Sequence, residues 1–133
     1  MNSKMLIGGV LGGIVLFGLG WLVYGVIFAD SMTGMPCMRT PETMNIPMIA
    51  LGNILMGILL AYIYSKWASI STFVGGATAA IVIGVLMYGG FDCLMYGTTT
   101  MFDSMTGILM DVVMGSVMLA IAGGVIGWWM GRK

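Results

Sequence analysis

The sequence predicts an all-α, polytopic membrane protein in which four transmembrane helices form two tandem hairpins. Three observations predict this: an apolar composition, four long uncharged stretches and a repeated motif. Hydrophobic residues make up 59% of the chain and charged residues 8%, whereas a soluble domain carries about 25% charged residues. A soluble fold of 133 residues cannot bury that much apolar surface, but in a bilayer the surface need not be buried. We therefore expect one membrane domain over residues 1–133, with the lipid bilayer as its first partner.

Four uncharged stretches lie between the charged residues, and each is long enough for the roughly 20 residues that a spanning helix needs. They predict helices at about 5–28, 47–66, 72–97 and 107–130. Continuous rather than alternating apolarity disfavours a transmembrane β-barrel. The first helix is expected to be an uncleaved anchor, because its apolar run exceeds the roughly 7–15 residues of a signal-peptide core.

The basic residues predict the orientation. One side of the predicted bundle would hold Lys4, Lys66, Arg132 and Lys133. Arg39 alone would lie on the other side. The positive-inside rule then places both termini in the cytoplasm, in a multi-pass protein of the inner (plasma) membrane.

A repeated motif relates the two halves of the chain. L-x-Y-G followed by D-S-M-T-G occurs within residues 22–34 and again within 94–107. Both copies fall at the outer end of an odd-numbered predicted helix. We interpret this as a parallel internal repeat of a helical hairpin, with halves at about 5–66 and 72–130. Parallel repeats occur in some transporters, and the simpler interpretation is that duplication builds a stable four-helix bundle.

Glycines at four-residue spacing recur in the first and fourth predicted helices. The candidates for helix packing are Gly8, Gly9, Gly12 and Gly13, together with Gly123, Gly127 and Gly131. Small residues at this spacing let helix backbones approach closely. These glycine faces are predicted to pack either within the bundle or against a second copy or other membrane subunits.

Polar residues inside the predicted spans form a candidate intramembrane cluster. Asp92, Asp111 and Asn53 fall at similar depths in three helices, while Tyr24 and Tyr96 fall nearer the surface. An intramembrane carboxylate is unfavourable and commonly marks function, so the cluster predicts proton, cation or substrate binding. In the structural alternative, a helix dipole stabilises Asp111, and Asp92 is neutral and hydrogen-bonded.

The outer loop, residues 30–46, is rich in sulfur. The candidate metal ligands in it are Cys37, Met35, Met38 and Met32. Thioethers and thiolates select copper(I), which is therefore the one cofactor that the sequence suggests. A loop that lies on the membrane surface would also favour methionine.

The end of the first predicted helix reads F-G-L-G-W-L-V-Y-G-V-I-F, residues 17–28. This glycine-, tryptophan- and tyrosine-rich end resembles a family of small four-helix bacterial membrane proteins known only as a domain of unknown function. The resemblance implies four helices and no assigned activity, and it carries over no site residue. The sulfur-rich loop departs from that family's pattern.

The composition also limits the classes of function that we expect. Histidine is absent, so the commonest proton-transfer group and metal ligand is missing. The net charge is zero and there is no basic stripe, so no nucleic-acid partner is expected. We expect a non-catalytic membrane subunit or accessory protein, not an enzyme, in an oligomer or larger complex. The alternatives are a small transporter or channel that uses the Asp/Asn cluster, and an outward-facing copper(I)-binding protein.

Overall fold

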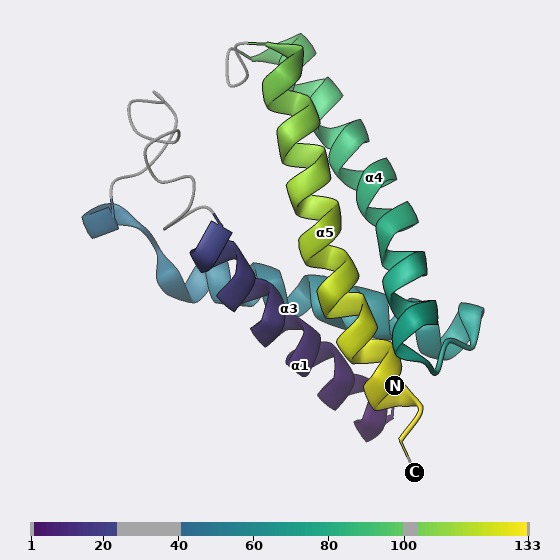
Figure 1. Cartoon of the computed structure of the whole chain (residues 1–133). Helices are drawn as coiled ribbons and strands as arrows, with labels where there is room; N and C mark the ends of the chain where they lie inside the picture. Colours follow the sequence, from purple (N-terminus) through teal and green to yellow (C-terminus); the bar gives the residue numbers. More distant parts are fainter. Residues whose placement is uncertain (1, 24–40, 100–103, 133) are drawn as a thin grey trace.

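The computed structural model describes residues 2–23, 41–99 and 104–132, and these parts of the chain are almost entirely helical (Figure 1). The four long helices are α1 (Ser3–Gly20), α3 (Ile46–Ile63), α4 (Phe73–Thr98) and α5 (Met105–Met130). A short helix, η2 (Pro41–Thr43), precedes α3, and a π-helical turn, η3 (Tyr64–Ala68), extends it. Each long helix, taken with its extension, is long and apolar enough to cross a membrane. The predicted all-α class with four spanning helices is confirmed.

Polar caps set the starts of the helices. The residues that precede α1, α3, α4 and α5 are Asn2, Asn45, Thr72 and Ser104. Each accepts a hydrogen bond in its side chain from a backbone N–H of the first turn, which satisfies a donor that has no partner within the helix. Ser104 belongs to the second D-S-M-T-G motif, so this copy begins α5. Most of the first copy, including its D-S-M-T-G, lies outside the described residues, and the duplication stays a prediction.

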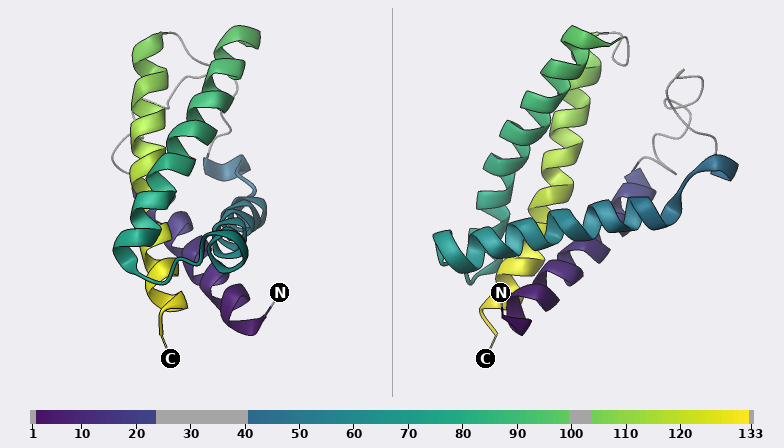
Figure 2. Two further views of the ribbon diagram at one scale, coloured as in Figure 1. Left: turned by 90° about the vertical axis from the view of Figure 1, so that its right-hand side faces the viewer. Right: turned by 180° about the vertical axis from the view of Figure 1, so that it is seen from behind.

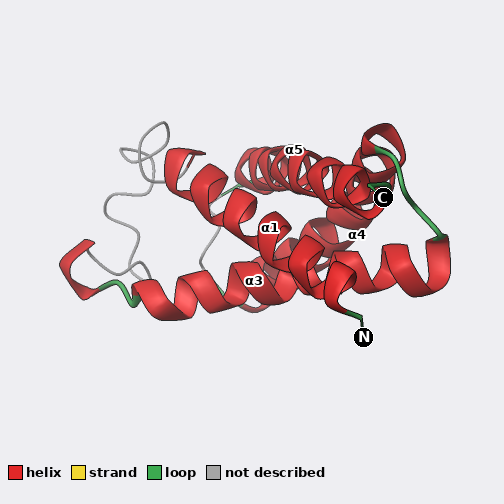
Figure 3. Ribbon diagram, turned by 90° about the horizontal axis from the view of Figure 1, so that it is seen from below, coloured by secondary structure: helices red, strands yellow, loops and turns green. Residues whose placement is uncertain are grey.

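The helices form two antiparallel pairs, α1 with α3 and α4 with α5 (Figures 1 and 2). The pairs meet at the end where both termini lie and diverge toward the other end. Seen from below, α1 lies between α3 and α5 (Figure 3). Contacts of α5 with α1 and α3 therefore join the two pairs.

The core lies where the two pairs meet. The largest fully buried side chains are Tyr64, Met5, Leu60, Leu119 and Ile126. They come from the start of α1, the end of α3 with its extension, and the second half of α5. The diverging halves of the pairs leave much of their apolar surface uncovered, as a surrounding bilayer allows.

Glycines let α1 contact two helices at once. A Cβ atom on Gly13 would lie 2.5 Å from the Cα atom of Ile54 in α3, and one on Gly57 would overlap the backbone of Gly9. The other glycine face of α1 meets α5, where a Cβ on Gly12 would overlap the side chain of Ile126. A larger side chain at Gly13 or Gly57 would require a shift of the helices, whereas one at Gly12 would require the side chain of Ile126 to move.

The α4–α5 pair also packs closely through glycines. A Cβ on Gly76 of α4 would overlap the carbonyl oxygen of Gly123 in α5, and one on Gly127 would overlap that of Thr72. The fully buried Tyr64 adds a polar link, since its hydroxyl donates to the carbonyl oxygen of Gly76 at 2.5 Å. This hydrogen bond ties the end of the first pair to the start of α4.

All seven glycines predicted to pack helices contact another part of the same chain. The structure thus supports packing within the bundle for these faces. A second copy would not reach the six buried ones without separating helices that already touch, whereas Gly131 is exposed at the end of α5.

Candidate intramembrane carboxyl site

Asp92 lies in the outer half of α4, the half remote from the chain termini, on the face that packs against α5. The buried residues of α4 are Gly76, Ala80, Gly84 and Asp92. Each step of four residues turns only about 40° around a helix, so these residues form one seam that winds slowly around α4 against α5, and this seam also holds the carboxyl group. Only 2% of Asp92 is exposed.

Asp111 of α5 is the partner of Asp92. A side-chain hydrogen bond and an electrostatic interaction link the two residues. An ionised carboxylate only accepts hydrogen bonds, so a bond between two carboxyl groups requires that one of them carries a proton. The two aspartates therefore form an acid pair that can share one proton.

One oxygen of the pair is orphaned. Oδ2 of Asp92 is buried and has no hydrogen-bond partner within residues 2–23, 41–99 and 104–132. A buried acceptor that lacks a donor is unfavourable by roughly 1–3 kcal/mol. A proton, a cation or a ligand donor would therefore be stabilised most by binding at this oxygen.

Two further polar residues lie along the same seam. The ring of Tyr88 packs on Gly115, where an added Cβ would lie 2.8 Å from Cε2 of the ring, and its phenol interacts electrostatically with both carboxyls. Ser116 is 5% exposed, and its hydroxyl also lacks a partner within the described chain. Sequence reasoning missed both residues. For Tyr88 the signal was present, because it precedes Asp92 by one helical turn.

The other predicted members of the cluster lie elsewhere. Asn53 belongs to the α1–α3 pair, and its side-chain amide donates to the carbonyl oxygen of Ile49 in its own helix at 2.8 Å. The outer half of the α4–α5 pair extends away from α3 (Figures 1 and 2). Tyr96 lies near the end of α4 and is 43% exposed, and Tyr24 lies outside the described residues. The structure thus joins the two aspartates and keeps Asn53 in the other pair.

The predicted copper(I) ligands also fall outside the described residues. They are Cys37, Met35, Met38 and Met32. Within the ranges that the structure covers, no group of three or more His, Cys, Asp or Glu residues could hold a metal ion. The copper(I) site stays a prediction.

Comparison with known proteins found no match: no protein-family model fits the chain, and no curated protein and no solved structure matches it. The resemblance to a family of small bacterial membrane proteins gains no support from these comparisons. Inference about function therefore starts from the site and from the surfaces of the helices.

Proposed function

We propose that this chain is a non-catalytic membrane subunit that packs against another transmembrane helix, from a second copy or a larger complex, through the outside of α4. The observation that carries the proposal is that α4 is little covered by its own chain and also presents glycines that meet no neighbour. In the most apolar stretch of each helix, 17% of α4 and 17% of α3 are buried, against 33% of α1 and 44% of α5. A helix with one covered seam presents most of its surface to lipid or to a partner.

One face of α4 suits a partner helix better than lipid. We name it the α4 outer face, and it consists of Val82, Leu86, Gly90, Cys93 and Gly97. Their spacing of three or four residues keeps them on one side of the helix, away from the buried Asp92. A Cβ on Gly90 or Gly97 would meet no atom within 4 Å, and Leu86 is 70% exposed. Exposed small residues at this spacing permit close approach of another helix.

The glycine faces of α1 and α5 support this choice by exclusion. The sequence makes these faces candidates for an external contact, but in the structure they contact other parts of the same chain. The α4 outer face retains two glycines without a neighbour, Gly90 and Gly97, whereas α3 has one such glycine, Gly52, and those of α1, Gly18 and Gly20, are two residues apart and so do not share a side of the helix.

Cys93 allows a direct test, because it is an exposed free thiol on this face. In a Cys37→Ser variant, a benzophenone maleimide attached to Cys93 in native membranes is expected to cross-link to protein upon illumination. Peptide mass spectrometry would then assign the adduct to this chain or to a partner. Adding Gly90→Leu should abolish the protein adduct, because the larger side chain keeps the neighbouring helix away.

A matched control places the thiol on another side of α4. Phe91 is 59% exposed and lies well away from the α4 outer face around the helix. The F91C variant, in a background without Cys37 and Cys93, is expected to yield only lipid adducts. Equal protein adducts at both positions, or lipid adducts alone at Cys93, would contradict the proposal.

The Asp92–Asp111 pair supports a second candidate, a small transporter or channel that moves protons or cations. The supporting observation is the orphaned Oδ2 atom inside a seam that also contains Tyr88 and Ser116. Intramembrane acid pairs serve proton relays in pumps and transporters. In such a transporter, Asp92 binds the transported proton or cation, and Asp111 exchanges a proton with Asp92.

A further inference from the structure

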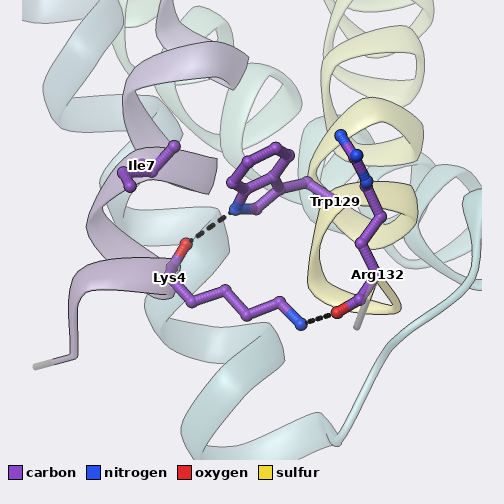
Figure 4. Close-up of a pocket in the computed structure, with 4 residues that line it drawn as sticks. All are labelled: Lys4, Ile7, Trp129 and Arg132. Carbon is purple, nitrogen blue, oxygen red and sulfur yellow. Dashed lines mark hydrogen bonds between the residues drawn. The ribbon is translucent and has the colours of Figure 1, made fainter.

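A small, open pocket lies between the first turns of α1 and the end of α5 (Figure 4). Its volume is about 320 Å³, and it is lined by Lys4, Ile7, Trp129 and Arg132. Two of the four lining residues are cations, one is aromatic and one is aliphatic. That combination matches the parts of an amphiphile: a charged head beside an apolar chain.

Interactions between the two helix ends hold the cations in place. The ammonium group of Lys4 donates to the backbone carbonyl of Arg132, and the indole N–H of Trp129 donates to that of Lys4 at 3.0 Å (Figure 4). The guanidinium group of Arg132 lies 5.1 Å and 5.2 Å from the ring centroids of Trp128 and Trp129. Cation–π contacts at this range orient a guanidinium group and leave its N–H donors free for an anion.

Acidic residues do not neutralise this pocket within the described chain. The three described acids are Glu42, Asp92 and Asp111. Glu42 precedes α3 and the two aspartates lie in the outer halves of α4 and α5, whereas the pocket lies at the opposite end. An ammonium group has three donors and a guanidinium group five, so among the described residues no acid offsets the positive charge of the pocket, and its cations carry more donors than the one that Lys4 uses.

The surroundings distinguish a lipid from a free ion. Ile7, Val10 and Ile14 are 47%, 38% and 58% exposed, and their spacing places them on one side of α1. This apolar strip starts at the pocket and runs along the helix toward the middle of the span. Indole rings such as that of Trp128, which is 51% exposed, favour the headgroup level of a bilayer.

The geometry points to a binding site for the phosphate headgroup of an anionic phospholipid, with an acyl chain along Ile7, Val10 and Ile14. Arg132 and Lys4 would bind the phosphate oxygens, for which a guanidinium fork is well shaped. Basic pockets between transmembrane helices bind lipid headgroups of this kind. The lipid would join the first and last helices and so clamp the end where the two hairpins meet.

Native mass spectrometry of the detergent-solubilised protein tests this site with phosphatidylglycerol and phosphatidylcholine as probes. We expect phosphatidylglycerol to bind in preference to phosphatidylcholine. Arg132→Gln should weaken phosphatidylglycerol binding about five- to tenfold, the effect of roughly one interfacial charge. Lys66→Gln is the matched control, because it removes an exposed positive charge outside the pocket and should leave binding unchanged.

Two further variants keep the test decisive if Arg132→Gln disturbs folding. Arg132→Lys retains the charge but loses the planar fork, so binding should be intermediate. Ile7→Trp retains both cations but fills the pocket, so binding should be lost while the circular dichroism spectrum stays helical. Equal losses in Arg132→Gln and Lys66→Gln would overturn the proposal. So would displacement of phosphatidylglycerol by an equal concentration of inorganic phosphate.

Discussion

Replacing Gly57 with alanine is expected to destabilise the protein by about 3 kcal/mol, the upper part of the range for an overpacked interior. The added Cβ atom would overlap the backbone carbonyl of Gly9 and lie 2.5 Å from the backbone nitrogen of Gly13. Backbone atoms cannot rotate away as the end of a side chain can. The α1–α3 pair must therefore separate, and α1 would also shift against α5.

Gly52 provides the control in the same helix. A Cβ atom at this position would meet nothing within 4 Å, and alanine is the better helix former by about 1 kcal/mol. Gly52→Ala is therefore expected to leave stability unchanged or raise it slightly. Reversible unfolding in mixed detergent micelles, followed by circular dichroism, measures both variants. Equal stability of Gly57→Ala and Gly52→Ala would show that α1 and α3 do not pack as described.

Dicyclohexylcarbodiimide is expected to label the Asp92–Asp111 pair at neutral pH. This apolar reagent enters membranes and adds to protonated carboxyl groups, and the shared hydrogen bond keeps a proton on one of the two residues. Glu42 is exposed and precedes the span that begins at Ile46, so the reagent, which accumulates in the apolar interior of the membrane, should leave it unlabelled. Mass spectrometry of peptides locates the adduct.

The Asp92→Asn variant distinguishes a proton shared between the two carboxyl groups from the effect of burial alone. Asparagine has no carboxyl group that could share a proton with Asp111, so if the natural pair shares one proton, labelling of Asp111 should fall to background. Circular dichroism checks that the variant keeps its helices. Labelling of Asp111 at the wild-type level in this variant, or no labelling of either aspartate in the natural protein, would contradict the shared proton. The second result would also remove the main support for ion transport.

The positions of the helices could be predicted because a bilayer restricts the chain so strongly. Backbone groups in the hydrocarbon region must be paired within the segment, so each uncharged stretch of sufficient length forms a helix. The starts of the helices are set by polar residues such as Thr72 and Ser104, which cap the N-termini of α4 and α5. The predicted starts, at about 72 and 107, differ from the observed ones by one or two residues.

The partners of each polar residue could be predicted only in part. Asp92 and Asp111 fall in helices joined by a short connection, so equal depth is enough to bring them together. Asn53 falls at a similar depth but belongs to the α1–α3 pair. The two pairs diverge because of the glycine contacts between their helices. Depth along a helix can be counted in the sequence, but the direction of a side chain around the bundle depends on packing. Tyr88 was missed although it precedes Asp92 by one helical turn; the spacing places the two residues on neighbouring turns, and the packing of α4 on α5 shows that Tyr88 faces the same seam.

Thiol labelling across a sealed membrane tests most directly whether the four helices all cross it. In a variant without natural cysteines, single cysteines would replace Ser3, Ser71 or Thr99, which are all exposed and lie at the ends of helices. The account predicts that a membrane-impermeant maleimide, applied to sealed right-side-out vesicles, labels T99C at once. It should label S3C and S71C only after detergent opens the vesicles. Equal labelling of S71C and T99C, or opposite behaviour of S3C and S71C, would contradict the four-span arrangement.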